Sequence, residues 1–305
     1  MKLILERINK RFTSSEVYII STLIILNVIL IYCFFIEFSV YTTFLYNLFL
    51  IGIIVLISKI FEFKQNRGVL RQVYLVPFIF LVYTNVRVII NILFSNDYDS
   101  ILIKIDELIL GNQIGIILKP FINPILTEYL QICYFMFFIM PIIHITELSR
   151  RENHNDFDKL TRNIIFGFMF SYLLYLFIPA IGPRFTIFEF SQISKELPGL
   201  FFTDYIRELV NVGGGIPLNS LNPAIDVNRD CMPSGHTMMT TINIYFAYKF
   251  QSKLRYLFYI IGISLIFSTM YLRYHYFIDI IAGLIFAYIS IKFESIIYQK
   301  LKKNG

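Results

Sequence analysis

Long runs of uncharged, mostly apolar residues constrain this chain more than any other feature. Residues 17–35, 38–58 and 163–183 contain no Asp, Glu, Lys or Arg. A run of about 20 such residues spans the hydrocarbon core as a helix, because its backbone N–H and C=O groups are then all hydrogen-bonded within the segment. Only 16% of the residues are charged, against about 25% in an ordinary soluble domain. We therefore predict an all-α integral membrane protein; a soluble protein with unusually buried helices is the alternative.

The apolar runs predict eight membrane-spanning helices, and the placement of Lys and Arg predicts their orientation. All but eight of the 27 basic residues lie at the two termini or in the connections after the second, fourth and sixth spans. Cytoplasmic loops are enriched in Lys and Arg. We therefore expect both termini in the cytoplasm, in a multi-pass protein of the plasma (inner) membrane. The predicted spans are 17–36, 40–58, 73–94, 127–146, 163–181, 233–249, 256–273 and 275–293.

Two connections on the predicted outer side are long. Within 95–126, apolar residues recur at helical spacing with Lys104, Asp106 and Glu107 between them, which predicts an amphipathic helix on the membrane surface. The connection 182–232 predicts a further helix near 201–210, ended by three glycines, and is either a lid or a loosely ordered loop. The predicted division is 1–94 for the first three transmembrane helices, 95–126 for the outer amphipathic segment, and 127–305 for a catalytic transmembrane core with outer loop 182–232.

Charge and cysteine content exclude several classes of function. The formal net charge of +6 fits either nucleic acid or an acidic membrane surface, and the clustering of charges at the ends of spans favours the membrane. Cys33, Cys133 and Cys231 lie far apart, so we expect packing residues rather than a disulfide framework. No metal-ligand spacing is present, and we predict neither a metal nor a cofactor. Nucleic acid is not an expected partner, and the sequence leaves the oligomeric state open.

His236 lies in a cluster that suits an anion site. It ends the sequence Cys231-Met-Pro-Ser-Gly-His236, at the start of the sixth predicted span. Pro233 is favoured in the first turn of a helix, where Ser234 and Gly235 then follow. The free N–H groups and the dipole of a helix start attract anions, so this cluster predicts contacts with a phosphate. The alternative is an ordinary helix start capped by a serine.

His275 and Asp279 form the second candidate cluster, at the start of the eighth predicted span. They are four residues apart, so on a helix they share one face. A carboxylate there accepts the proton of one imidazole nitrogen and leaves the other nitrogen free as nucleophile or base. A carboxylate within an apolar span is costly and is by default a functional candidate. A structural ion pair between Asp279 and a nearby Arg or His is the alternative.

Two arginines are predicted at the same membrane face. Arg184 follows the helix-breaking pair Gly182-Pro183, and Arg273 stands two residues before His275. Arginines neutralise phosphate oxygens and hold them in bidentate fashion. One histidine can attack phosphorus while the other protonates the leaving oxygen. These residues together predict metal-independent phosphoryl transfer at the outer face of the membrane.

The segments around His236 and His275 resemble those of the type 2 phosphatidic acid phosphatase superfamily. Its second signature, Pro-Ser-Gly-His, matches 233–236, and its third ends in His-x-x-x-Asp, as at 275–279. The stretches 178–184 and 105–111, with the Arg-Tyr-His spacing from Arg273, resemble the inositol phosphorylceramide synthase-like branch. The resemblance implies a core helical bundle of that superfamily's kind. It also implies that His275 is the nucleophile, Asp279 orients it, His236 is the general acid, and Ser234, Arg184 and Arg273 hold the phosphate.

The chain also departs from the superfamily's pattern. The first signature, Lys-x6-Arg-Pro, is absent as such, and Arg184 is the expected substitute. Thr269 stands where the wider superfamily has the arginine of its third signature, and Arg273 stands closer to the histidine, as in the synthase branch. That branch more often has a bulkier residue at the position of Gly235. Arg87, in the third predicted span, either extends outward to the interface or contributes to phosphate or headgroup binding.

Three functions remain open from the sequence. The first is a phosphatase, in which water resolves a phosphohistidine formed from a lipid phosphate or diphosphate. The second is a transferase resembling inositol phosphorylceramide synthase, in which an alcohol or a second lipid is the acceptor. The third is a lipid transporter or scaffold without catalysis, and the intact His, Ser, Asp and Arg positions argue against it.

Overall fold

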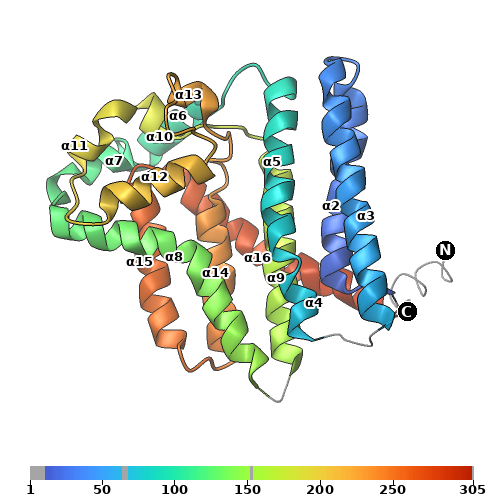
Figure 1. Ribbon diagram of the computed structural model, residues 1–305. Coiled ribbons are helices and arrows are strands. Elements are labelled where there is room, and N and C mark those ends of the chain that lie inside the picture. Colours follow the sequence, from blue (N-terminus) through green and yellow to red (C-terminus); the bar gives the residue numbers. More distant parts are fainter. Residues whose placement is uncertain (1–10, 64–67, 152–153, 304–305) are drawn as a thin grey trace. The chain divides into compact units, whose positions relative to one another are not determined.

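The computed structural model describes residues 11–63, 68–151 and 154–303, and within these ranges the chain is helical and contains no strand (Figure 1). The predicted all-α class is therefore confirmed. The contacts divide the chain into two compact units. The first comprises Met1–Ser95, Ser149–Leu176 and Tyr288–Gly305, and the second comprises Asn96–Leu148 and Phe177–Ala287.

The first unit is a bundle of long apolar helices. Its members are α2 (Ser14–Cys33), α3 (Tyr41–Phe63), the short α4 (Val69–Val73), α5 (Val76–Leu93), α9 (His154–Leu174) and the last part of α16 (Phe277–Lys303). Helix α2 packs against α3, α5 and α9. Polar side chains connect these helices inside the apolar bundle: Asn85 donates to Asn47 at 2.6 Å, and Asn47 donates to Asn27 at 2.8 Å. Such hydrogen bonds hold helices together where no water competes.

Two buried ion pairs also stabilise the first unit. Arg71 pairs with Glu16 at 2.9 Å, and Arg162 pairs with Glu294 at 2.8 Å. Both arginines are in the count of Lys and Arg residues that predicted the orientation of the spans. They are buried because each has a carboxylate to neutralise it, which offsets part of the cost of desolvation. Of the other basic residues in that count, Lys2, Arg7, Lys10, Lys64 and Arg67 lie outside the described residues.

Helices occupy all eight predicted spans, although not all of them satisfy the requirements for crossing a membrane. Five candidate spans are long and apolar enough: Ser14–Cys33, Phe38–Phe61, Val69–Leu93, Pro124–Ser149 and Phe277–Lys302. Helix α15 (Arg255–Tyr271) is apolar but shorter, and α9 and α14 (Gly235–Lys249) are not among the candidates. A multi-pass membrane protein is thus supported by five helices, and the count of eight stays a prediction.

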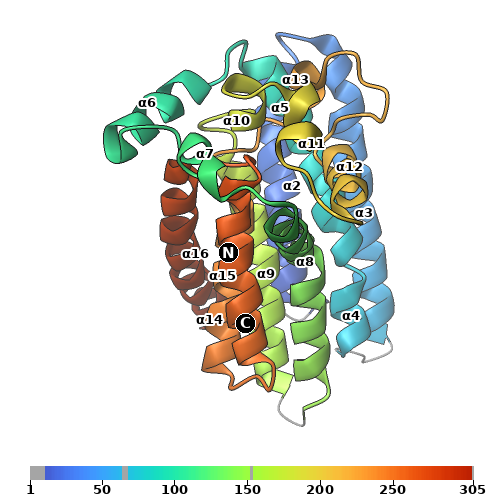
Figure 2. The same ribbon diagram turned by 90° about the vertical axis from the view of Figure 1, so that its left-hand side faces the viewer.

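The second unit combines long helices with a group of short ones at one end. Helices α8 (Pro124–Ser149), α14 and α15 carry the group, and α14 and α15 lie side by side (Figures 1 and 2). Helix α12 lies where the sequence predicted a helix near 201–210. The short helices of the group are α6 (Asp99–Leu110), α7 (Ile114–Ile117), α10 (Pro183–Thr186), α11 (Ile193–Glu196), α12 (Thr203–Gly213) and α13 (Pro223–Asp226).

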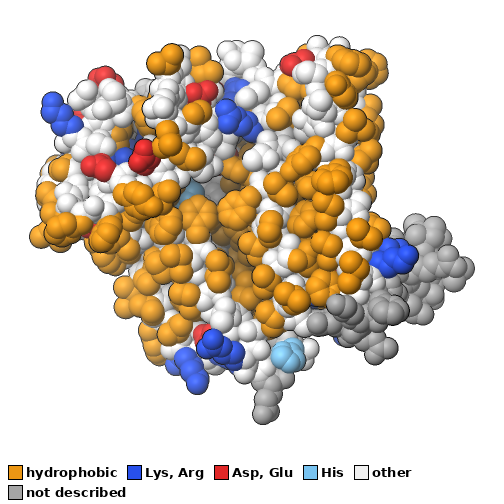
Figure 3. Space-filling model, in the orientation of Figure 1, with side chains coloured by type: hydrophobic (Ala, Val, Ile, Leu, Met, Phe, Trp, Pro, Cys, Tyr) orange, Lys and Arg blue, Asp and Glu red, His pale blue; other side chains and the backbone are white. Residues whose placement is uncertain are grey.

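The surface of both units is apolar along the lengths of the long helices. In Figure 3 hydrophobic side chains cover α3 in the first unit and α8 and α15 in the second. In the second unit, charged side chains gather over the short helices and again at the far ends of α14 and α15. Large apolar side chains on the long helices are exposed, including Phe49 at 62% and Ile260 at 59%. A continuous apolar exterior of this kind is the surface that a bilayer covers.

Candidate active site

The first candidate segment is the start of α14, and Ser234 is its N-cap. The Oγ atom of Ser234 accepts a hydrogen bond from the backbone N–H of Thr237 at 3.2 Å, and Ser234 is fully buried. Pro233 therefore precedes the cap, whereas the sequence predicted it in the first turn. The helix begins later because the serine hydroxyl satisfies one of the free N–H groups of that turn. The capping serine considered as an alternative is thus present, and contact of Ser234 and Gly235 with a phosphate stays a prediction.

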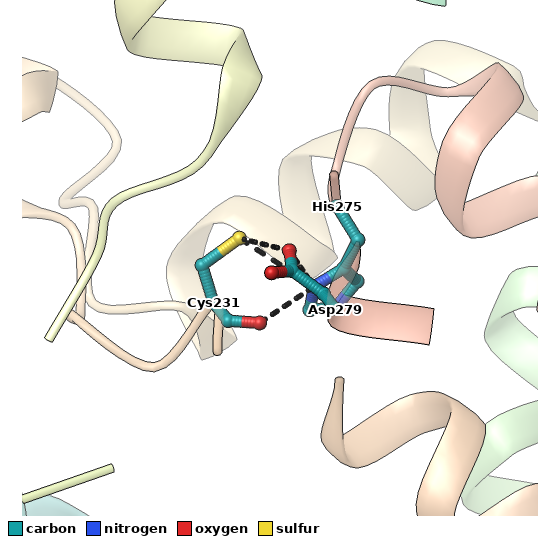
Figure 4. A group of neighbouring side chains, drawn as sticks. All are labelled: Cys231, His275 and Asp279. Atoms are coloured by element: carbon teal, nitrogen blue, oxygen red, sulfur yellow. Dashed lines mark hydrogen bonds and ion pairs between the residues drawn. The ribbon is translucent and has the colours of Figure 1, made fainter. Parts of the chain in front are cut away.

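A backbone carbonyl determines which ring nitrogen of His275 carries the hydrogen. Its Nδ1 atom lies 2.9 Å from the carbonyl oxygen of Cys231 and 3.3 Å from Oδ2 of Asp279 (Figure 4). A carbonyl oxygen can only accept, so Nδ1 must carry the hydrogen. The lone pair of neutral His275 therefore lies on Nε2. The predicted His–Asp pairing is present, although His275 precedes α16, which begins at Phe277, and does not share a helix face with Asp279. The nearer partner of Nδ1 is one that the sequence did not indicate.

Asp279 is fully buried, and one of its two carboxylate oxygens accepts several hydrogen bonds. Its Oδ2 atom accepts a hydrogen bond from the backbone N–H of Tyr276 at 2.8 Å and one from the Cys231 thiol at 3.0 Å. Its backbone carbonyl accepts from the N–H of Ser234 at 3.1 Å, which joins the starts of α14 and α16. The Oδ1 atom has no hydrogen-bond partner among the described residues. Asp279 therefore connects both signature segments.

His236 is held in a column of aromatic rings. Its ring stacks on Tyr134 with a centroid distance of 4.4 Å, and Tyr134 stacks on Tyr274 at 4.2 Å. The guanidinium carbon of Arg184 lies 4.2 Å from the centre of the Tyr274 ring, at the end of this column. The rings of His236 and His275 are 5.8 Å apart. The two histidines therefore face one region, with Arg184 fixed near them by cation–π contact.

Arg273 is buried in a conformation that non-glycine residues rarely adopt. Its φ angle is 65°, in the left-handed region, which costs about 1–2 kcal/mol. The side chain is 1% exposed, pairs with Glu196 and lies 3.8 Å from the centre of the Phe188 ring. Within the described part of the chain, its Nε and Nη2 atoms have no hydrogen-bond partner, and neither has the buried hydroxyl of Tyr274. Buried donors of this kind are expected to meet an acceptor, and a phosphate oxygen would serve.

Arg207 is a third buried arginine in the same electrostatic environment, and the sequence did not single it out. Its guanidinium donates to Ser194 at 2.7 Å and to the carbonyl oxygen of Leu197 at 2.9 Å. Burial lowers the pKa of Arg207, and the positive charges of Arg184 and Arg273 lower it further. Arg207 also pairs with Asp204 at 2.8 Å, as Arg273 pairs with Glu196, and these carboxylates offset part of the positive charge that favours an anion here. Arg184 is fixed there by a hydrogen bond to Asn211 at 2.7 Å.

Helix α6 supplies two buried carboxylates that support the site. Asp106 accepts hydrogen bonds from the backbone N–H groups of Phe277 at 2.7 Å and Ile278 at 2.9 Å, and so caps the start of α16. Asp99 accepts from the N–H groups of Ile181 at 3.0 Å and Gly182 at 2.8 Å. Burial raises the pKa of both carboxyl groups, and the backbone hydrogen bonds oppose this shift. The sequence placed Asp106 on the polar face of a surface helix; it is fully buried because the free amides of α16 need an acceptor.

The comparison with protein families identifies the family of this chain. The model of the PAP2 superfamily, the type 2 phosphatidic acid phosphatases, matches residues 102–293. The chain belongs to the PAP2 superfamily. A search of curated proteins and a search of solved structures each gave no match. Membership of the PAP2 superfamily supports an enzyme with phosphatase-type activity on lipid phosphates, and the membrane-embedded helices are consistent with a lipid substrate in the bilayer.

The two other histidines and Arg87 lie outside the PAP2 signatures in the sequence. His154 is exposed. The Nδ1 atom of His144 lies 2.8 Å from Oδ1 of Asn243. Arg87 belongs to α5 in the first unit, and its contribution stays a prediction.

One group near the PAP2 signatures has the side chains of a metal site. Ligand-type atoms of Cys231, His275 and Asp279 lie within 4.8 Å of one another. Thiol, imidazole and carboxylate together suit Zn²⁺. In this structure the three side chains hydrogen-bond to one another, while Oδ1 of Asp279 has no hydrogen-bond partner among the described residues.

Proposed function

We propose that this PAP2 protein transfers the phosphoryl group of a lipid phosphate or diphosphate through a phosphohistidine on His275. The observation that carries the proposal is the hydrogen bond from Nδ1 of His275 to the Cys231 carbonyl, at 2.9 Å. It leaves the Nε2 lone pair available, beside a second histidine whose ring is 5.8 Å away. A nucleophile oriented through its other nitrogen, next to a separate acid–base group, is the arrangement that covalent phosphoryl transfer needs.

In the first step Nε2 of His275 attacks phosphorus, and the bond between phosphorus and the lipid oxygen breaks. Protonated His236 gives its proton to that oxygen, so the lipid leaves as an alcohol or, from a diphosphate, as a monophosphate. Asp279 and the Cys231 carbonyl stabilise the positive charge that develops on the imidazole of His275. Arg184 and Arg273 neutralise the phosphate oxygens, supported by the unpartnered Nε and Nη2 donors of Arg273.

In the second step an acceptor oxygen attacks the phosphorus of the phosphohistidine. Neutral His236 takes the proton of the acceptor, and the P–N bond breaks, returning its electron pair to Nε2. With water as acceptor the product is inorganic phosphate, and the reaction is that of a phosphatase. With an alcohol or lipid headgroup the reaction is a transfer, as the resemblance to inositol phosphorylceramide synthases suggests.

The placement of this chemistry in the cell follows from the charge distribution. We propose that both termini lie in the cytoplasm and that the short helices around the active site lie at the outer face of the plasma membrane. A cysteine introduced at exposed Leu221, in the connection before α14, would then react with an impermeant thiol reagent in intact cells. Labelling only after lysis would reverse the orientation.

The test of the catalytic proposal uses the purified full chain in detergent or liposomes. Phosphate release is measured from a panel of lipid phosphates and diphosphates in the presence of a chelator, with His275→Ala as the blank. We expect release that survives chelation and is lost in the variant. We also expect an acid-labile, base-stable phosphoprotein from ³²P-labelled substrate, and its accumulation in His236→Ala when the leaving group needs no proton. The proposal fails if His275→Ala retains activity.

The acceptor is tested in the same preparation. A lipid with a labelled phosphate is supplied together with an inositol or lipid alcohol, and labelled inorganic phosphate and labelled lipid are separated. Label in a new lipid that depends on His275 identifies the transferase. Label in inorganic phosphate alone identifies the phosphatase. If His275→Ala changes neither the labelled products nor the lipid profile of the cell, a transporter or scaffold is favoured.

A further inference from the structure

Cys231 occupies the point where three catalytic segments meet. Its backbone N–H donates to the carbonyl oxygen of Ala180 at 3.1 Å, four residues before Arg184. Its carbonyl oxygen accepts from Nδ1 of His275 at 2.9 Å. Its Sγ atom lies 3.0 Å from Oδ2 of Asp279 (Figure 4). One residue thus contacts the segments that carry the arginine, the nucleophile and its carboxylate.

The thiol of Cys231 is enclosed on all sides by these groups. Cys231 is 5% exposed, and its Sγ is also 3.5 Å from the Tyr274 carbonyl oxygen and 3.5 Å from Nδ1 of His275. The backbone at Gly182, with φ at 92°, approaches so closely that a Cβ there would lie 3.1 Å from Sγ. The close approach of this glycine keeps the sulfur against Asp279.

We propose that the Cys231 thiol is a positioning residue for the transfer reaction, which it supports by donating a hydrogen bond to Oδ2 of Asp279. The carboxylate accepts from the thiol and from the N–H of Tyr276, and these two donors hold it in the plane where it meets His275. The sequence predicted Cys231 to be a packing residue, like Cys33 and Cys133. This inference rests on the proposed function, because the carboxylate acts through the nucleophilic histidine.

The thiol is suited to donate rather than to react. Burial raises the pKa of Cys231, and the negative charge of Asp279 raises it further. The sulfur therefore keeps its hydrogen at neutral pH, and Oδ2 of Asp279, at 3.0 Å, is a nearer acceptor than the Tyr274 carbonyl oxygen at 3.5 Å. Although an S–H group is a weak donor, its hydrogen bond stabilises the buried carboxylate, because no water is present to replace a donor that is lost there.

Four single variants test the inference in the lipid phosphate assay with chelator present. Cys231→Ser keeps an O–H donor, Cys231→Ala removes it, and Cys133→Ala removes another buried thiol of the same unit. We expect kcat to fall about tenfold in Cys231→Ala, with little change in KM, because the substrate contacts remain. Cys231→Ser is expected to recover most of this loss, and Cys133→Ala to match the wild type. The fourth variant is Asp279→Asn.

A double-mutant cycle separates positioning from packing. If the thiol acts through Asp279, adding Cys231→Ala to Asp279→Asn lowers kcat by less than twofold further. A full additional tenfold loss would overturn the inference, as would a Cys231→Ser variant no more active than Cys231→Ala. Wild-type protein without any transfer activity would instead refute the proposed function. Thiol-dye melting curves, run on each variant, exclude unfolded protein from the comparison.

Discussion

Asp106 offers the sharpest test of how the fold supports the site, because its carboxylate reaches from α6 to the start of α16. It accepts hydrogen bonds from the N–H groups of Phe277 and Ile278 at 2.7 and 2.9 Å and is fully buried. Replacing it by Ala leaves both amides without an acceptor, at about 1–3 kcal/mol each. Burial raises the pKa of Asp106, so removing the charge returns part of this cost. We expect a net loss of about 2–4 kcal/mol for Asp106→Ala.

Asp106→Asn should have a smaller effect on the same properties. The amide keeps one acceptor oxygen but turns an NH₂ group toward the other backbone N–H, so we expect a loss of about 1–2 kcal/mol. The start of α16 carries Asp279, and a displacement there moves the carboxylate relative to His275. We therefore expect kcat to fall about tenfold or more in Asp106→Ala, and less in Asp106→Asn.

The assay combines stability and kinetics in detergent. A dye that reacts with thiols reports unfolding, because the three cysteines are buried, and the melting temperature should fall by about 2 °C per kcal/mol. Glu107→Gln is the matched control, because Glu107 is the next residue on α6 and is exposed. Equal melting temperatures and equal kcat for Asp106→Ala and Glu107→Gln would refute the cap.

Three further changes follow from the packing around the site. A Cβ at Gly283 would lie 2.8 Å from the backbone carbonyl oxygen of Ser234, the N-cap of α14. Gly283→Ala should therefore force α14 and α16 apart and lower both the melting temperature and kcat. Gly52→Ala is the control, because a Cβ at Gly52 would meet nothing within 4 Å. Glu128→Ala removes the acceptor for the four backbone N–H groups of residues 200–203. We therefore expect faster proteolytic cleavage in this connection and a raised KM. An unchanged cleavage rate would contradict this prediction. Tyr134→Leu removes the ring that stacks on His236, the proposed general acid, at a centroid distance of 4.4 Å. We expect kcat to fall about tenfold, while the acid lability of the phosphohistidine stays unchanged. An unchanged kcat would show that the aromatic column does not position His236.

The sequence predicted those features that depend on short-range pattern. Apolar runs placed helices at all eight expected positions, because the cost of exposing backbone polar groups in lipid makes a helix the only local solution. The prediction that His275 and Asp279 share one face of a helix is wrong, because α16 begins at Phe277, but the two residues are paired at 3.3 Å. The signature around His236 identified a helix start, and the superfamily it indicated is confirmed. The synthase-like branch, the roles of the site residues and the topology remain predictions.

Only the tertiary structure revealed how the catalytic residues are held. Asp106 meets α16 across 171 residues of sequence, and the thiol of Cys231 meets Asp279 across 48. The column from His236 through Tyr134 and Tyr274 to Arg184 likewise joins four separate segments. None of these contacts has a spacing that a single sequence can display, because each depends on where two helices happen to pack. Burial then decides the outcome: an aspartate that looks solvated on its own helix becomes a cap when the free amides of another helix need an acceptor.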